Sequence, residues 1–339
     1  GSEMCIRDRV TSSLEGGGNQ NYFAVCSKNF GNGRNLRLNE GSQNSSTADI
    51  AVGSNNKAKI SFFNKIGATC HWIPKKVGGQ DYSSKYSVGI WKEAKGYFSV
   101  DNYFTANTAG TNNTVYSALG AVPEFMLIKR GLNSNGDWIV FHKDIATTAA
   151  TIPDYYLVAS SAAPKVNIIN FWGTNEYSDW GVNNNSGESL SYFYLGNDSN
   201  VYVGGGRYPY SLFSWASLPG FSKFGAYTGN GNATGPSIDC GFSAGARLVM
   251  IKNVDEHQAW LWVNPSASGN DTQVKIAFDA TTPPNDNESS SAGNVVDNQF
   301  CRYITNEDVV DKTSNGFQIK GTNPNRNKNG DRYIYCAWA

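Results

Sequence analysis

Aromatic rings and polar side chains that could bind a sugar lie close together between residues 171 and 180. Trp172, Tyr177, Asp179 and Trp180 occupy this stretch, which is also rich in asparagine and serine. Aromatic faces can stack on the apolar C–H face of a sugar ring, while carboxylate and amide groups bind its hydroxyls. We therefore interpret these four residues as a candidate ligand-binding site. The structural alternative is a long hairpin whose tryptophans close the edge of a sandwich.

Two patterns could serve catalysis, and neither fits well. A polysaccharide depolymerase needs two carboxylates about 5–10 Å apart across a cleft, and Glu176 and Asp179 are the nearest candidates. Residues Gly241–Gly245 match the Gly-x-Ser-x-Gly elbow of serine hydrolases. That elbow requires a helix after the serine, whereas a strand-like run begins at Arg247. We predict no catalytic residues and no enzyme activity.

The residues that could bind a metal ion lack the spacing of a metal site. The loop Asn325–Asp331 resembles the start of a calcium loop, but it offers a single carboxylate, whereas calcium needs several oxygen ligands. His71, His142 and His257 are far apart, and only His71 has a neighbouring cysteine, Cys70. This is no recognised zinc-ligand pattern. We predict no metal and no cofactor.

A short aromatic phrase occurs three times and is the clearest pattern in the chain. A tyrosine, a tryptophan and a glycine follow one another at intervals of five residues, and the last copy ends after its tryptophan. Trp215 and Trp338 are 123 residues apart, which is the size of a whole domain. The phrase residues are Tyr86, Trp91, Gly96, Tyr210, Trp215, Gly220, Tyr333 and Trp338. We expect them to be a structural signature, with their rings in the core.

The repeat divides the chain into tandem units. We predict a second repeat domain at residues 96–219 and a third at 220–339. Residues 10–95 match the back part of a repeat, so we interpret them as a partial first domain whose opening strand is missing. Residues 1–9 fit no part of the repeat and resemble translated adapter sequence, and we interpret them as a non-native tail. The linkers between units are short, so neighbouring domains should stack closely.

The sequence predicts an all-β fold. Apolar runs at Phe125–Lys129 and Trp138–Phe141 flank a loop rich in glycine and asparagine, which is typical of a hairpin. Arg247–Lys252 and Trp260–Val263 repeat the pattern. Further strands are expected at Tyr155–Ala159, Val274–Phe278, Phe317–Lys320 and Tyr333–Trp338. Short strands with frequent turn signals favour tandem β-sandwich or jelly-roll-like domains of about 120 residues.

Composition argues against several classes of partner. The chain has 28 Lys and Arg against 28 Asp and Glu, and only 17% of its residues are charged. Binding to nucleic acid or to a membrane surface would need a basic patch. No apolar run reaches the roughly 18 residues of a membrane span. Six scattered cysteines include no Cys-x-x-Cys pair, so we expect free buried thiols, which suits assembly in a reducing cytoplasm.

Three segments of the last unit carry a family likeness. They are Gly220–Gly231, which ends in a Thr-Gly-Asn-Gly turn, Leu248–Lys252, and the closing Asp331–Ala339. They resemble an uncharacterised β-rich domain that is repeated in tail and fibre-like structural proteins of marine bacteriophages. The resemblance covers nearly the whole chain beyond Gln20 and is weakest in the first unit. It implies a virion appendage protein and supplies no catalytic residues.

On this resemblance we expect a structural protein of a phage tail or tail fibre, assembled in the host cytoplasm and carried on the virion. Its partners would be other virion proteins and a host-cell surface glycan or envelope protein, which loops on several copies, in a homotrimer for example, bind multivalently. One alternative is a secreted carbohydrate-binding adhesin array, which neighbouring genes would distinguish. The other is a polysaccharide depolymerase, which would release reducing sugar from host polysaccharide.

Overall fold

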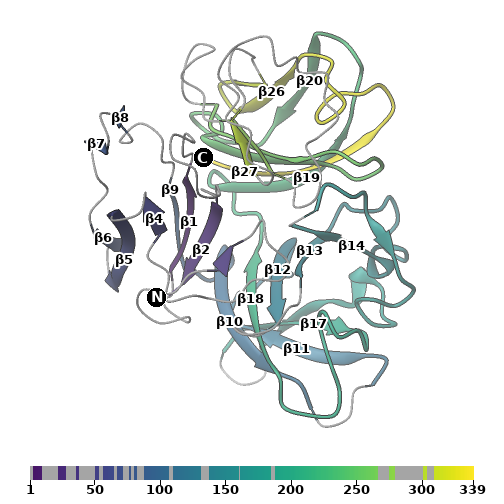
Figure 1. Ribbon diagram of the computed structural model, residues 1–339. Coiled ribbons are helices and arrows are strands. Elements are labelled where there is room, and N and C mark those ends of the chain that lie inside the picture. Colours follow the sequence, from purple (N-terminus) through teal and green to yellow (C-terminus); the bar gives the residue numbers. More distant parts are fainter. Residues whose placement is uncertain are drawn as a thin grey trace.

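The computed structural model describes residues 91–339 except 107–109, 131–136, 160, 185–187, 266–274, 279–300 and 304–308. Between residues 3 and 90 it describes the backbone of the strands only, and the same holds for two strands at 275–278 and 301–303. The described chain is all-β, as its sequence predicts, with antiparallel sheets and two short 3-10 helices. Figure 1 shows how these sheets are arranged.

Residues 98–215 contribute nine strands, which we call the first strand set. They build a six-stranded sheet of order β10-β18-β12-β13-β14-β15 and a three-stranded sheet of order β11-β17-β16. The strands are β10 (Phe98–Phe104), β11 (Asn113–Ser117), β12 (Phe125–Arg130), β13 (Trp138–His142), β14 (Tyr155–Val158), β15 (Val166–Asn167), β16 (Gly181–Asn183), β17 (Leu190–Leu195) and β18 (Pro209–Trp215).

Residues 222–338 contribute nine more strands, the second strand set. They build a six-stranded sheet of order β19-β27-β21-β22-β23-β24 and a three-stranded sheet of order β20-β26-β25. The strands are β19 (Ser222–Thr228), β20 (Thr234–Asp239), β21 (Leu248–Asn253), β22 (Trp260–Val263), β23 (Lys275–Phe278), β24 (Cys301–Tyr303), β25 (Val310–Lys312), β26 (Gly316–Lys320) and β27 (Arg332–Trp338).

The two strand sets share one topology. Numbered from its own first strand, each set has a large sheet of order 1-9-3-4-5-6 and a small sheet of order 2-8-7. Both predicted hairpins are present, as β12 with β13 and as β21 with β22. The predicted domain boundaries at residues 96, 219 and 220 stay a prediction, since sheet order alone does not define them.

The N-terminal strands pair in a related order. The strands β1 (Glu3–Arg9), β2 (Tyr22–Ser27), β3 (Leu36–Arg37) and β9 (Val88–Lys92) form a sheet of order β3-β2-β1-β9. β1 pairs with the strand that follows it and with the strand that carries Trp91, as β12 and β21 do in their sets. We expected residues 1–9 to fit no part of the repeat, so this pairing differs from that expectation.

The remaining N-terminal strands form two small sheets. The order β4-β5-β6 joins three of them, and β7 pairs with β8. These strands are β4 (Ile50–Val52), β5 (Asn56–Asn64), β6 (Gly67–His71), β7 (Lys76–Val77) and β8 (Gln80–Asp81). Cys70 and His71, the one adjacent cysteine–histidine pair of the chain, therefore belong to β6, where only the backbone is described.

Strand burial follows the sequence pattern. In β17 the residues alternate between half-buried and buried, because one face of the small sheet is covered and the other is not. In β13 all five residues are buried, as expected for a continuous apolar run. β27 is buried on both faces. Tyr333 and Tyr335 pack between the sheets of their own set, while Ile334 and Trp338 pack into the core of the first set.

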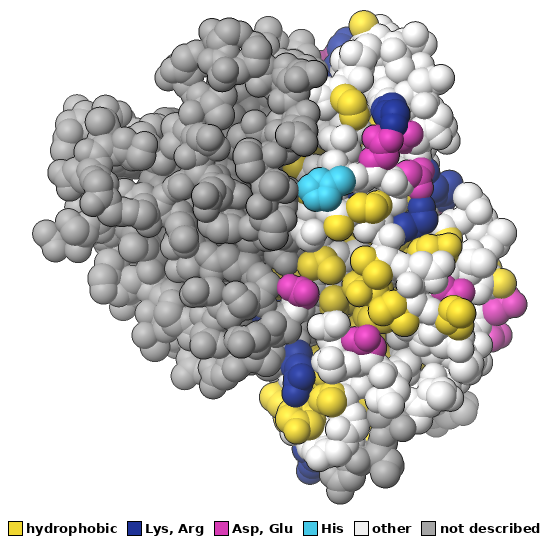
Figure 2. All heavy atoms as spheres, turned by 45° about the vertical axis from the view of Figure 1, so that its right-hand side comes forward, with side chains coloured by type: hydrophobic (Ala, Val, Ile, Leu, Met, Phe, Trp, Pro, Cys, Tyr) yellow, Lys and Arg dark blue, Asp and Glu magenta, His cyan; other side chains and the backbone are white. Residues whose placement is uncertain are grey.

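The described surface carries few charges. Figure 2 shows one face, on which charged side chains of both signs form small scattered patches between uncharged groups. Six large hydrophobic side chains are exposed, namely Phe104, Tyr116, Ile168, Ile169, Tyr208 and Phe221. A surface of this kind depends on uncharged polar groups for its contacts with water and with partners.

The joint between the phrase and the next strand has the same geometry at both described copies. Gly96 has a φ of 77° and Gly220 a φ of 80°, which is left-handed backbone that favours glycine. An isolated bridge closes around each glycine, pairing Ala94 with Phe98 and Leu218 with Ser222. The glycine therefore reverses the chain within five residues before the next strand begins.

Replacing Gly220 by alanine should lower the free energy of unfolding by about 1–2 kcal/mol, because a Cβ is disfavoured at positive φ. No atom lies within 4 Å of the added Cβ, so the loss comes from the backbone alone. Gly220→Asn should lose less, since asparagine tolerates this conformation. Urea unfolding measures the effect, with Gly110→Ala as the control at a glycine without positive φ. Equal stability of G220A and the unmodified protein would contradict the account.

Candidate functional site

The tryptophans of the three phrase copies meet in one cluster. The ring centroid of Trp91 lies 6.4 Å from that of Trp215 and 5.4 Å from that of Trp338, both in edge-to-face geometry. Trp262 of β22 joins them at 6.3 Å from Trp91 and 6.1 Å from Trp338. Edge-to-face packing is the favoured arrangement of aromatic pairs. Residues far apart in the sequence thus share one core.

Phenylalanines extend this cluster across the boundary between the strand sets. Phe125 at the start of β12 stacks on Phe224 of β19, with centroids 5.9 Å apart. Phe125 also lies 5.1 Å from Trp215, and Phe224 lies 5.7 Å from Trp338. Figure 1 shows β19 and β27 passing across the ends of β12 and β18. One end of the first large sheet is therefore packed against the outer face of the second.

The phrase tyrosines form a second pair of matched contacts. Tyr210 stacks on Tyr103 at 5.0 Å in the first set, and Tyr333 stacks on Tyr227 at 4.9 Å in the second. The hydroxyl of Tyr103 donates to the Val201 carbonyl, and that of Tyr227 donates to the Arg326 carbonyl. Burial raises the pKa of both Tyr103 and Tyr227. The described tyrosines and tryptophans of the phrase are all buried; Tyr86 lies outside the described residues.

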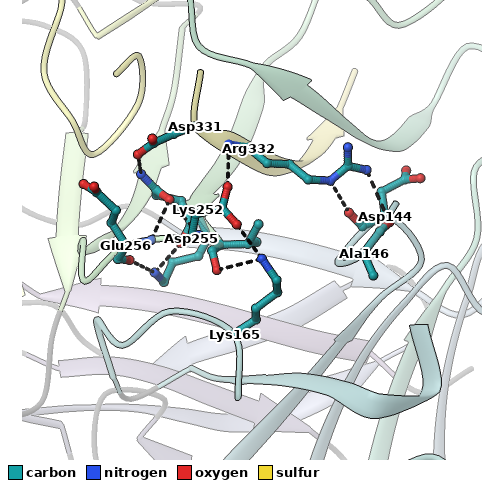
Figure 3. Close-up of polar contacts among 10 residues, drawn as sticks. Asp144, Ala146, Lys165, Lys252, Asp255, Glu256, Asp331 and Arg332 are labelled. Carbon is teal, nitrogen blue, oxygen red and sulfur yellow. Dashed lines mark hydrogen bonds and ion pairs between the residues drawn. The ribbon is translucent and has the colours of Figure 1, made fainter. Parts of the chain in front are cut away.

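A polar cluster joins the strand sets at the Arg332 end of β27, the end opposite Trp338 (Figure 3). The guanidinium of Arg332 in β27 donates from Nε to the Asp144 carbonyl at 3.0 Å. Asp255 accepts the Arg332 backbone N–H at 2.9 Å and forms an ion pair with Lys165 of the first set. Burial raises the pKa of Asp255, but the hydrogen bonds from Lys165 and Arg332 outweigh it and hold that pKa below its usual value.

Lys252 of β21 is the fully buried charge of this junction. Its ammonium group donates to the Asn253 carbonyl at 2.6 Å and, across the boundary, to the Ala162 carbonyl at 3.1 Å. The indole N–H of Trp260 also crosses, donating to the Val158 carbonyl at 3.2 Å. Buried polar groups are costly unless they are paired, so these bonds fix how the sets are oriented. Neither Lys165 nor Arg332 stands out in the sequence, where each is one charged residue among many.

His142 lies fully buried at the same boundary. Its Nδ1 accepts the Asp144 N–H at 3.1 Å, so Nε2 carries the proton and donates to the Tyr335 carbonyl at 3.1 Å. Burial lowers the pKa of His142 from 6.5 to about 3, although the bond to Tyr335 opposes the shift. The imidazole is therefore neutral in the folded protein over the ordinary pH range.

The four residues of the candidate ligand site lie mostly inside the first strand set. Trp172 is 0% exposed, and its Nε1 donates to the Tyr155 carbonyl at 2.7 Å. Trp180 is 4% exposed and stacks on Phe141 at 4.6 Å. Tyr177 is half-buried and donates its hydroxyl to the Pro123 carbonyl. Both indoles are packed against core rings, so where they lie they cannot stack on a sugar.

Asp179 is the one exposed member of this group. With Glu176 it forms a capping box around the 3-10 helix Tyr177–Asp179, in which each carboxylate accepts from the other residue's backbone. Glu176 and Asp179 are the two carboxylates that the depolymerase hypothesis requires, and both thus bond to the backbone of this short helix. The quartet therefore corresponds to the structural alternative, in which aromatic rings close the edge of a sandwich.

The other sequence motifs weighed as catalytic or metal-binding sites are loops whose residues have structural roles. Gly241–Gly245 lies between β20 and β21, and a strand follows it instead of a helix. In the loop Asn325–Asp331, the buried Asn327 donates to the carbonyls of Asn232 and Gly321. In the described part of the chain, no group of three or more His, Cys, Asp or Glu could hold a metal ion. Cys240 and Cys336 are buried free thiols, as expected.

Removing the Trp338 ring should lower the free energy of unfolding by about 3–5 kcal/mol, because it leaves a cavity in the shared core. Trp338→Phe should cost less, since the buried indole N–H of Trp338 has no hydrogen-bond acceptor to lose. Phe221→Ala is the matched control, because Phe221 is 63% exposed and should change stability by no more than about 0.5 kcal/mol. Denaturant unfolding measures all three, and a W338A loss as small as that of F221A would contradict the cluster's role.

Stability should fall as the pH drops from about 6.5 toward 3, because the unfolded chain protonates His142 while the folded protein does not. The slope from this residue is up to about 1.4 kcal/mol per pH unit. His142→Gln keeps a hydrogen-bonding side chain without this titration and should flatten the slope. His257→Gln at the exposed histidine is the control. Unfolding curves across this pH range would refute the assignment if H142Q kept the full slope.

Comparison with known proteins gives a family and no activity. No helix in the described part of the chain has the length and apolar character needed to cross a bilayer. A search of curated proteins and a search of solved structures each found no match. One family model, described as a domain of unknown function, DUF7483, matches residues 87–339. It spans both strand sets together with the Trp91 strand β9, and the chain belongs to the DUF7483 family.

Proposed function

We propose that the chain is a non-enzymatic structural protein of a bacteriophage tail or tail fibre that contributes to recognition of the host surface. The observation that carries this proposal is the stiff joint between two strand sets of the same topology, in which Trp91, Trp215 and Trp338 share one core. Two segments, Gly220–Gly231 and Asp331–Ala339, resemble repeats of phage appendage proteins, and this resemblance also supports a phage-tail protein.

A stiff tandem scaffold suits a protein that presents surfaces at fixed spacing. The two sets are joined by buried aromatic rings, by the Lys165–Asp255 ion pair and by the Lys252 ammonium. Such a joint keeps the outer small sheets of the two sets in constant positions. When several chains are displayed on one particle, weak contacts add up through effective concentration without any new contact. Binding by such a protein therefore needs no single high-affinity pocket.

The proposal is tested on purified virus particles and on host cells. Mass spectrometry of purified virions from a host that carries the gene should detect the chain, and labelled antibody should mark tails or fibres by electron microscopy. Light scattering of the recombinant protein checks for the trimer expected of a fibre. The purified protein should also bind intact host cells and should not bind non-host cells. Absence from the particles, together with no binding to host cells, would refute the proposal.

A further inference from the structure

Three tyrosines lie on the uncovered face of the small sheet β11-β17-β16. Val115, Phe193 and Leu195 point into the core, so alternation along the strands places Tyr116, Tyr192 and Tyr194 on the other face. Tyr116 is 50% exposed and stands opposite Tyr192 in the register. The centroids of Tyr192 and Tyr194 are 6.2 Å apart. We call these three side chains the tyrosine face.

The ring of Tyr192 lies against the neighbouring strand, β16. Gly181 of β16 pairs with Tyr192, and a Cβ at Gly181 would lie 2.6 Å from the Tyr192 hydroxyl and 2.8 Å from its Cζ. The Tyr192 ring therefore lies across β16, in space that any other residue would fill. One side of the ring thus covers the backbone of β16, and the side chain as a whole is half-buried.

Hydrogen-bonding side chains border the tyrosine face, and one of them, Asp179, is a carboxylate. Asn112 hydrogen-bonds Asn175, and Asn175 donates to Asp179 at 3.3 Å. A Cβ at Gly173 would lie 2.9 Å from the Tyr194 Cβ and would also meet Asn112 Oδ1, so Asn112 lies close to Tyr194. Burial raises the pKa of Tyr194, and the Tyr192 hydroxyl and the Asp179 carboxylate raise it further. No residue of β11, β16 or β17 is charged. The face thus combines aromatic rings with amides and hydroxyls on uncharged strands, with the Asp179 carboxylate at its border.

The second strand set has the same sheet without these rings. When the two sheets are matched on the buried residues Val115 and Ile238, the positions of the three tyrosines hold Asp239, Gly316 and Gln318. The fold therefore does not require aromatic side chains here. Exposed aromatic rings that the fold does not use are a common feature of binding surfaces.

We propose that the tyrosine face binds a neutral polysaccharide by stacking pyranose rings on Tyr116 and Tyr192, while the Tyr194 ring, turned 74° from that of Tyr192, borders the sugar with its edge and hydroxyl. Ring faces match the apolar C–H faces of sugars, while Asn112, Asn175 and the tyrosine hydroxyls can bond sugar hydroxyls. The uncharged strands fit a neutral chain better than an acidic one. This inference rests on the proposed function, because it names the ligand class through which host-surface recognition would act.

Affinity electrophoresis tests the proposal with the full chain. The gels contain soluble β-1,3-glucan, xylan, hydroxyethyl cellulose or dextran, with alginate as the acidic probe. At least one neutral polysaccharide should retard the protein, and added salt should not abolish the retardation. Tyr116→Ala and Tyr192→Ala should each weaken binding about tenfold, the effect of losing one stacked ring. Tyr192→Phe should retain most of the binding, because it keeps the ring.

Gln318→Ala, at the matched position of the second set, is the control and should bind like the unmodified protein, with unchanged melting temperatures showing that each variant folds. Retardation by none of the neutral polysaccharides, or equal retardation of the tyrosine-to-alanine variants, would overturn the proposal. Cell binding that persists in those variants would refute this inference and leave the proposed function standing. Retardation of a protein that is absent from virions and does not bind host cells would support the ligand class and refute the proposed function.

Discussion

Burial of the second large sheet on both faces is the constraint on which the rest of the structure depends. Its inner face forms a core with the small sheet β20-β26-β25, and its outer face completes the core of the first strand set. Trp338 belongs to the outer face, where its ring packs against Trp91 of β9 and Phe224 of β19 and joins the core cluster of the first set. Residues of both sets therefore share one core at this boundary.

This constraint explains what the repeated phrase does. The tyrosine of the phrase fixes the strand inside its own sandwich, the tryptophan reaches the shared cluster, and the glycine at positive φ starts the next strand. The sets differ on their small sheets. The tyrosine face in the first set and the polar residues at the matched positions of the second are such a difference.

The repeat spacing and the apolar runs were sufficient to predict the all-β class and both hairpins, because buried strands leave a direct pattern in the sequence. The candidate site could not be predicted in the same way. Trp172 and Trp180 have the residue types of a sugar platform, but residue type does not distinguish a core ring from an exposed one. Tyr192 and Tyr194 are marked only by their alternation in β17, whose meaning depends on which face the core covers.

Native-state hydrogen exchange tests the central claim most directly, since it reports the opening free energy of each strand separately. The account predicts that slowly exchanging amides of β12 and β18 and those of β21 and β27 share one global opening free energy. It also predicts that Trp338→Ala lowers all of them together. Two separate opening free energies, with only β21 and β27 affected by the substitution, would show that the strand sets unfold independently and would contradict the account.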